Sequence, residues 1–251
     1  MSDQVHTSKQ GSKQKLGRPP AQALEVGTLR PGDPRMLETQ VYNLLRRALM
    51  KGAIGAGTAF STRTLADRLG ISPMPVRGAL KRLEGEGVLQ AHARSGYRVA
   101  PIDAPEYVEI IQIRARLEGM ATALAATRIT GRELDRLRRW NAALAQPGVS
   151  GQRFLRRNHG FHFELYAAAH SPILLQNIEM YWVRIGPILY SSLNGYDQAR
   201  VVRTHGAIIE ALADHDPVRA EEMVRSDLMS ACGPVIDALS QAAPPISAIS
   251  Y

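Results

Sequence analysis

The segment 60–89 constrains the fold of this chain more than any other, because it predicts two short helices joined by a tight turn. The first helix ends at Gly70, since glycine accepts the left-handed conformation that closes helices. Ser72 can cap the second helix, and Pro73 suits its first turn, where no backbone N–H is needed. The apolar faces of the two helices follow helical spacing and are predicted to be Leu65, Ala66, Leu69, Val76, Ala79, Leu80 and Leu83.

The second helix of this pair is predicted to be apolar inside and cationic outside. Arg77, Lys81 and Arg82 project from its other faces. A helix of this kind suits insertion into the major groove of DNA. A supporting helix is expected over 37–51, and a β-hairpin wing over 90–100. The alternative, an amphipathic helix pair in some other class of protein, does not explain the cationic face, the wing and the spacing together.

The net charge of +8 is concentrated in the amino-terminal part of the chain. Residues 37–100 carry ten Lys and Arg against four Asp and Glu, whereas residues 101–251 carry fifteen against sixteen. This asymmetry favours a polyanion as the partner of the amino-terminal third, with a merely solvated basic face as the alternative. The first 35 residues are rich in Gln, Ser, Lys, Gly and Pro, and are expected to form a disordered basic tail.

The sequence offers no sign of export or of membrane insertion. The amino terminus is polar, and no window approaches twenty apolar residues. Cys232 is the only cysteine, so the chain cannot form an internal disulfide, which agrees with a reducing cytoplasm. A cytoplasmic location without membrane contact is therefore expected.

Every segment after the wing has helical period, so the expected fold class is mainly α. Helices are predicted at 104–127, 131–146, 152–169, 171–192, 198–213 and 216–239. The predicted organisation is a tail at 1–35, a winged helix-turn-helix domain at 36–100, a linker at 101–105, a helical domain at 106–240 and a flexible tail at 241–251.

The amino-terminal domain resembles the winged helix-turn-helix of the GntR superfamily of bacterial transcription regulators. The matching motifs are Ser61–Ala66, Leu69–Ser72, Pro75–Arg77, Leu80–Glu84 and Glu86–Gly87. Many motif positions agree in order and spacing over about sixty residues, which makes the resemblance specific. It implies DNA contacts at Arg63, Ser72, Pro73, Met74, Pro75, Arg77 and Gly96. Many relatives carry Arg at the position of Pro73.

The helical part resembles the FadR branch of that superfamily, whose carboxy-terminal FCD domain is a ligand-sensing helical bundle. The residues that carry this resemblance are Arg114, Leu117–Glu118, Asn158, His162, Ser171–Leu174 and Thr204–Ile208. This resemblance is looser than that of the amino-terminal domain. It implies that residues 106–240 bind an effector and mediate dimerisation.

The FCD resemblance also implies a divalent-metal site. Asn158 and His162 lie four residues apart and so project from one helix face. With His205 and Asp227 they occupy the positions that hold Asp, His, His and His in many FCD domains. Imidazole and carboxylate ligands suit zinc, nickel or manganese. The alternative is a metal-free polar core in which the two histidines are hydrogen-bonded.

Arg114 is a cation in an otherwise apolar helix face and therefore calls for an anion. The resemblance implies that it binds an effector carboxylate through its planar fork. The alternative is a structural ion pair with Glu118, one turn later. Arg184 and Tyr190 are weaker candidates for lining the same pocket.

Together these features predict a cytoplasmic, ligand-responsive regulator, and more specifically a repressor. We expect a homodimer on a near-palindromic operator in double-stranded DNA, since two-fold protein symmetry is mirrored by two half-sites. A small organic acid is expected to modulate DNA binding. Two alternatives are a metal-dependent enzyme with His162 or His205 as the base, and an architectural DNA-binding protein without an effector. The enzyme is disfavoured because the sequence has no nucleophile–base–orienter arrangement and no phosphate-binding loop.

Overall fold

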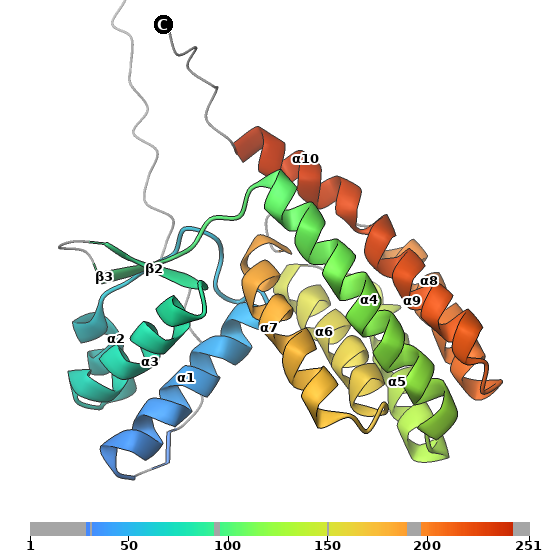
Figure 1. Ribbon diagram of the computed structural model, residues 1–251, viewed down its shortest axis with the longest axis horizontal. Coiled ribbons are helices and arrows are strands. Elements are labelled where there is room, and N and C mark those ends of the chain that lie inside the picture. The colour runs from blue at the N-terminus through green and yellow to red at the C-terminus, as the bar shows by residue number, and fades with distance from the viewer. Residues whose placement is uncertain (1–28, 31, 93–95, 150, 190–196, 243–251) are drawn as a thin grey trace, which may run out of the picture.

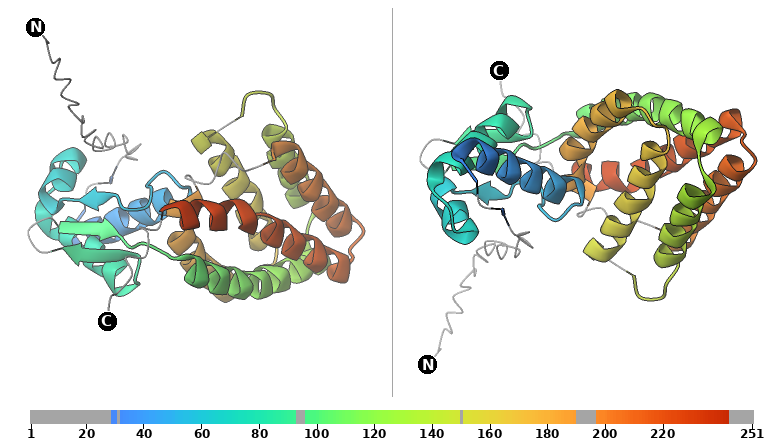
Figure 2. Two further views of the ribbon diagram at one scale, coloured as in Figure 1. Left: turned by 90° about the horizontal axis from the view of Figure 1, so that it is seen from above. Right: turned by 90° about the horizontal axis from the view of Figure 1, so that it is seen from below.

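The computed structural model describes residues 29–30, 32–92, 96–149, 151–189 and 197–242. The predicted terminal tails therefore lie mostly outside the described residues. The described residues up to Ala100 form a small α/β unit, which we call the head, and the helices after it form a unit that we call the bundle. Figure 2 shows the head at one end of the molecule and the bundle at the other.

The head consists of three helices and a small sheet (Figure 1). Its elements are α1 (Pro34–Met50), β1 (Ala59–Phe60), α2 (Thr62–Leu69), α3 (Pro73–Gly85), β2 (Leu89–His92) and β3 (Gly96–Val99). The strands are antiparallel in the order β1-β3-β2, with Leu89 opposite Val99 and His92 opposite Gly96. The predicted wing is thus present, and β1 adds a third strand that the sequence pattern did not indicate.

Local capping sets the ends of the head helices. Asp33 accepts a hydrogen bond from the backbone N–H of Met36, so α1 begins at Pro34, three residues earlier than expected. Gly70 ends α2 in the left-handed conformation (φ 66°, ψ 31°), as predicted. Ser72 occupies the N-cap position of α3, but its side chain makes no capping hydrogen bond, contrary to expectation. Its hydroxyl is consequently not committed to the helix.

The predicted apolar faces of α2 and α3 form the core of the head. Six of the seven predicted residues are buried, and Leu69 is partly buried against them. These side chains meet the buried face of α1, which supports the helix pair from behind. The opposite face of α3 is thereby left to solvent.

The bundle is entirely helical among the described residues. Its helices are α4 (Ala104–Arg128), α5 (Gly131–Leu144), α6 (Gly151–Ala167), α7 (Pro172–Leu189), α8 (Gln198–Ala213), α9 (Pro217–Ser230) and α10 (Cys232–Ala242). The helix α4 runs along the front of the bundle and packs against both α7 and α9 (Figure 1). It begins at Ala104, so the last two residues of the predicted linker belong to its first turn. Residues 190–192 of the predicted fourth bundle helix lie outside the described residues.

The single helix predicted over 216–239 is instead two helices, which meet at Ala231. Pro234 explains the break, because it has no N–H with which to continue the helical ladder to the carbonyl of Ser230. That carbonyl accepts a hydrogen bond from Nη2 of Arg200 instead, at 2.6 Å. The hydrogen bond from Arg200 therefore links the end of α9 to the start of α8.

The head and the bundle contact each other chiefly through α1 and α7. A Cβ atom built on Gly186 lies 2.1 Å from the carbonyl oxygen of Leu49, so the two backbones are in direct contact there. None of the helices among the described residues is long and apolar enough to cross a membrane.

Candidate nucleic-acid interface and bundle cavity

The outer surface of α2 and α3 is cationic and exposed. Arg63 lies in the first turn of α2, and Arg77 and Lys81 lie on the solvent side of α3. The guanidinium of Arg82 lies 3.6 Å from the ring centroid of Tyr42, so this arginine packs back onto the head instead of extending freely. Arg77, by contrast, projects into solvent near the start of α3, and the other side of this helix is anchored in the core. A base-reading arginine requires such a position.

The first turn of α3 separates the predicted DNA contacts into two groups. Ser72, Pro73 and Met74 are exposed, and Met74 exposes 70 % of its surface. Pro75 is buried, because the helix turns it toward the core next to Val76. The burial of its side chain limits what Pro75 can contact, and its predicted DNA contact stays a prediction.

Gly96 has a structural reason to be glycine. Its φ is +90°, and a Cβ atom there lies 2.2 Å from the carbonyl oxygen of Phe60. The residue begins β3 opposite His92, at the tip of the wing. Its predicted DNA contact stays a prediction, and any such contact is through the backbone.

The bundle holds a small, partly open cavity of about 50 Å³ that polar and apolar side chains line together. Its lining includes both groups of predicted bundle residues, since Arg114 and Asn158 lie there with His162 and Asp227. Trp182 and Arg200 line the same cavity and were not predicted. The space is sufficient for ordered water but not for an organic acid without movement of the side chains.

Two histidines and one carboxylate meet beside this cavity, which His162 and Asp227 line and His205 does not. Nε2 of His162 lies 3.4 Å from Oδ2 of Asp227, and Nε2 of His205 lies 3.9 Å from the same oxygen. One ligand atom from each of the three residues lies within 4.8 Å of the others. The helices α6, α8 and α9 thus bring together residues that are 65 positions apart in the chain.

The neutral state of the two histidines favours metal binding. Burial lowers the pKa of His205 to about 3, and burial together with His205 and Arg114 lowers the pKa of His162 well below its usual value. Both imidazoles are therefore neutral at pH 7. Burial, reinforced by Glu118, raises the pKa of the Asp227 carboxyl to about 7.

Hydrogen bonding also leaves imidazole nitrogens available. The hydroxyl of Tyr166 donates to Glu118, so it accepts from Nδ1 of His162, 3.1 Å away. This assigns the tautomer in which Nε2 of His162 has a free lone pair directed at Asp227. Both ring nitrogens of His205 are buried without a hydrogen-bond partner among the described residues. Buried polar atoms of this kind need a partner, and a divalent metal fits the donor set.

Arg114 is held by Glu118. Its Nε and Nη2 lie 2.6 and 3.2 Å from the two carboxylate oxygens, and both side chains are buried. The ion pair that the sequence left as an alternative is thus present. Because Arg114 also lines the cavity, its contact with an effector stays a prediction.

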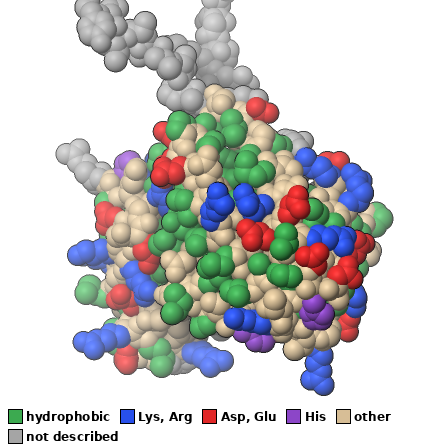
Figure 3. Space-filling view, turned by 45° about the vertical axis from the view of Figure 1, so that its right-hand side comes forward, with side chains coloured by type: hydrophobic (Ala, Val, Ile, Leu, Met, Phe, Trp, Pro, Cys, Tyr) green, Lys and Arg blue, Asp and Glu red, His purple; other side chains and the backbone are tan. Residues whose placement is uncertain are grey.

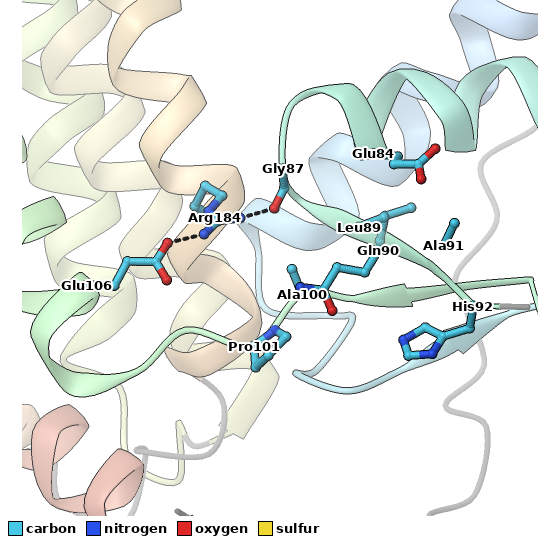
Figure 4. Close-up of a pocket in the computed structure, with 10 residues that line it drawn as sticks. All are labelled: Glu84, Gly87, Leu89, Gln90, Ala91, His92, Ala100, Pro101, Glu106 and Arg184. Atoms are coloured by element: carbon cyan, nitrogen blue, oxygen red, sulfur yellow. Dashed lines mark hydrogen bonds and ion pairs between the residues drawn. The ribbon is translucent and has the colours of Figure 1, made fainter.

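Two weaker candidates for the effector pocket have different outcomes. Arg184 does not line the cavity, so that prediction is wrong: its side chain points toward the head, where it donates to the carbonyl of Gly87 and pairs with Glu106 (Figure 4). Helical period alone could not fix this direction, which depends on the rotation of α7. Tyr190 lies outside the described residues.

Comparison with known proteins matches two parts of the chain. Residues 37–99 match the gntR family of bacterial regulatory proteins, and residues 109–229 match the FCD domain. The two matched segments coincide with the head and with most of the bundle.

Curated relatives and solved structures agree with this. The HTH-type transcriptional regulator McbR of Escherichia coli is 32 % identical over 195 residues, which are 74 % of this chain and 88 % of the relative. A probable D-xylose utilization operon transcriptional repressor of Paenarthrobacter nicotinovorans is 27 % identical and covers 73 % and 81 %. The solved structure of E. coli McbR/YncC superposes with a TM-score of 0.73 at 30 % identity, and covers 82 % of this chain and 97 % of that one.

Proposed function

We propose that this chain represses transcription as a homodimer on a near-palindromic operator. It belongs to the GntR family of bacterial regulatory proteins. It is a ligand-responsive, DNA-binding transcription regulator with an FCD domain. The exposed cationic face of α3, backed by a buried apolar face, is the observation that carries this proposal. As a regulator of this kind it acts in the bacterial cytoplasm, where its DNA lies.

Within the head, we assign base reading to α3 and phosphate contacts to α2. Arg77 reads a guanine through its bidentate fork. Arg63 contacts phosphate, aided by the uncommitted hydroxyl of Ser72. Selection from a pool of random duplexes, followed by footprinting, tests this assignment. A palindromic site protected over two half-sites supports it, and protection without sequence preference contradicts it.

The outer face of α4 supports a homodimer. Met120 is exposed on it, and three further apolar side chains of the same face are only partly buried: Ile113, Leu117 and Leu124. In the space-filling view, hydrophobic side chains extend down the middle of one face, between charged groups (Figure 3). Pairing through α4 covers such residues and sets two heads at a fixed separation. Light scattering of Met120→Glu against wild type tests it, because a buried carboxylate opposes pairing.

We propose that His162, His205 and Asp227 hold one divalent metal, with Asn158 beside it. The Nε2 of His205, which faces Asp227 and is unpartnered within the described part of the chain, is the observation that favours a metal over a metal-free polar core. When bound, the ion supplies a Lewis-acid site for an oxygen of a ligand. The ligand types do not distinguish zinc, nickel and manganese.

The effector proposed for this cavity is a small carboxylate. Two guanidinium groups, those of Arg114 and Arg200, line it from α4 and α8. Cationic groups around a polar cavity favour an anionic ligand, and the small volume favours a short one. A thermal-shift screen of organic acids, followed by operator binding with each hit, tests the proposal. If only uncharged or cationic compounds stabilise the protein and change operator affinity, the effector class is wrong while the DNA-binding role stands.

A further inference from the structure

Helix α7 contacts both the bundle cavity and the head. Trp182 lines the cavity, and its Nε1 donates to Oε1 of Glu118 at 3.0 Å. Two and four residues later, Arg184 and Gly186 contact the head. The distance between the two contact regions is thus about one helical turn.

The Trp182 side chain contacts the charged side chains Arg114 and Glu118. Its ring lies 4.5 Å from the guanidinium carbon of Arg114, and Glu118 holds both side chains. A ligand that draws Arg114 away from Glu118 changes the surroundings of the carboxylate oxygen to which Trp182 donates. Because packed interiors transmit strain, a displacement of the Trp182 ring acts on α7.

Several contacts connect the head directly to α7. Gly186 lies in backbone contact with Leu49, and the carbonyl of Pro187 accepts the N–H of Ala56 at 3.1 Å. At the other end of the contact, Arg46 of α1 pairs with Glu179 of α7 at 3.0 Å. The α1–α7 contact therefore behaves as one packed unit.

Arg184 extends this contact to the recognition helix. One end of its guanidinium donates to the carbonyl of Gly87, which lies just after α3, and the other pairs with Glu106 at the start of α4 (Figure 4). Figure 4 shows the side chain lying between the two units. Arg184 also lines an open cleft of about 580 Å³ there. The cleft gives the wing side of the head room to move when this clamp changes.

We propose that α7 transmits the state of the cavity to the recognition helix, with Trp182 as the responding side chain and Arg184 as the positioning residue that sets the orientation of α3. This inference rests on the proposed function, since it concerns how a cavity ligand reaches the DNA-binding surface. The mechanism requires two packings of α7 whose balance the cavity alters.

A double-mutant cycle without any ligand tests this coupling. Trp182→Phe keeps the aromatic ring but removes the donor to Glu118, and Arg184→Met removes the clamp but keeps most of the side-chain length. Operator affinity and amide hydrogen exchange are measured for wild type, both single variants and the double variant. Arg136→Met is the matched control, because it breaks the 2.6 Å pair of Arg136 with Glu164 within the bundle.

We expect Trp182→Phe to change operator affinity by about threefold to tenfold. It should also change hydrogen exchange at Gly87–Leu89 and at Gly52–Ala56. In the Arg184→Met background the effect on operator affinity should shrink to less than twofold. The Arg136→Met control should leave operator affinity and exchange in the head unchanged.

Three outcomes overturn the inference. If Trp182→Phe changes operator affinity equally in the wild-type and Arg184→Met backgrounds, Arg184 takes no part in the coupling. If amide hydrogen exchange changes only in the bundle, α7 does not transmit the state of the cavity to the head. The same conclusion follows if the Arg136→Met control changes operator affinity as strongly as Arg184→Met. If Trp182→Phe does not fold, Tyr166→Phe disturbs Glu118 from its other side and replaces it in the cycle. Failure of the wild type to bind any operator contradicts the proposed function instead, and the exchange measurements still test the coupling.

Discussion

The carboxylate of Glu118 accepts both hydrogen bonds of the Arg114 fork, at 2.6 and 3.2 Å, inside the bundle and one turn further along α4. Trp182 and Tyr166 donate to the same carboxylate. An effector carboxylate that reaches Arg114 must therefore share the guanidinium with a resident anion. Because the resident pair is already neutralised, ligand binding here is an exchange of partners.

The first prediction concerns this ion pair. Arg114→Ala leaves a buried carboxylate without its counter-ion and should lower the free energy of unfolding by about 3–5 kcal/mol. The double change Arg114→Met with Glu118→Gln removes both charges and should restore most of that loss. Urea unfolding of wild type, Arg114→Ala and the double variant measures these free energies of unfolding. Equal stability of Arg114→Ala and wild type contradicts a closed ion pair.

The second prediction concerns reading of DNA by α3. Arg77→Ala should cost about 1–3 kcal/mol of operator binding and relax the preference at one base pair. Arg63→Ala should weaken binding to all sequences and reduce the salt slope by about one. Titrations at several salt concentrations measure both, with Arg138→Ala on the exposed surface of α5 as the control. Full operator affinity after Arg77→Ala means that α3 is not the recognition helix.

The third prediction concerns Met74, the large exposed apolar side chain in the first turn of α3. Pro73 beside it offers no hydrogen-bond donor, so an apolar contact with a thymine methyl suits this position. Loss of one methyl contact costs about 0.8 kcal/mol, or about fourfold in affinity. Replacing each operator thymine in turn by deoxyuridine should reveal one sensitive position in each half-site.

Met74→Ala provides the control for that experiment. This variant should bind the thymine and deoxyuridine operators equally well, while Arg77→Ala keeps the difference between them. If no thymine of the wild-type operator is sensitive, Met74 does not read a methyl group.

The parts of the fold that the sequence predicted are those set by neighbours along the chain. Gly70 ends α2 because of its own backbone conformation, and the apolar period of α3 fixes which side is buried. The burial of Pro75 shows the limit, because its family position indicates a DNA contact but does not reveal that the helix turns its side chain into the core. Pro234 carried a readable signal, since proline interrupts a helix, yet the long apolar period around it favoured one helix.

The candidate site was predictable in its composition but not in its partners. His162, His205 and Asp227 do meet, as their spacing in the resembled family implied. Trp182 and Tyr166 were missed, because their contact with Glu118 depends on how α6 and α7 are rotated toward α4. Arg184 was misplaced for the same reason. The period of the apolar residues identifies the buried face of a helix, whereas tertiary packing decides which neighbouring helix that face meets.

The last prediction concerns the metal. Purified protein should retain up to one divalent ion per chain after dialysis, measured by elemental analysis, and the double change His162→Ala with His205→Ala should abolish retention. A metal at one hundred times its dissociation constant should stabilise the fold by about 2.7 kcal/mol, seen as a rise in melting temperature. Asp227→Asn removes the only carboxylate of the ligand set and should weaken binding, whereas Asn158→Asp adds one and should strengthen it.

This pair of opposite changes separates a metal site from a metal-free polar core. In a metal-free core, Asn158→Asp adds a second carboxylate to the cavity that Asp227 also lines, and lowers stability whether or not metal is supplied. In a metal site, the same variant is destabilised after chelation and gains more than wild type when zinc, nickel or manganese is added. Retention of metal by the double histidine variant places the ion elsewhere. Identical melting shifts for Asp227→Asn and Asn158→Asp show that neither residue touches it.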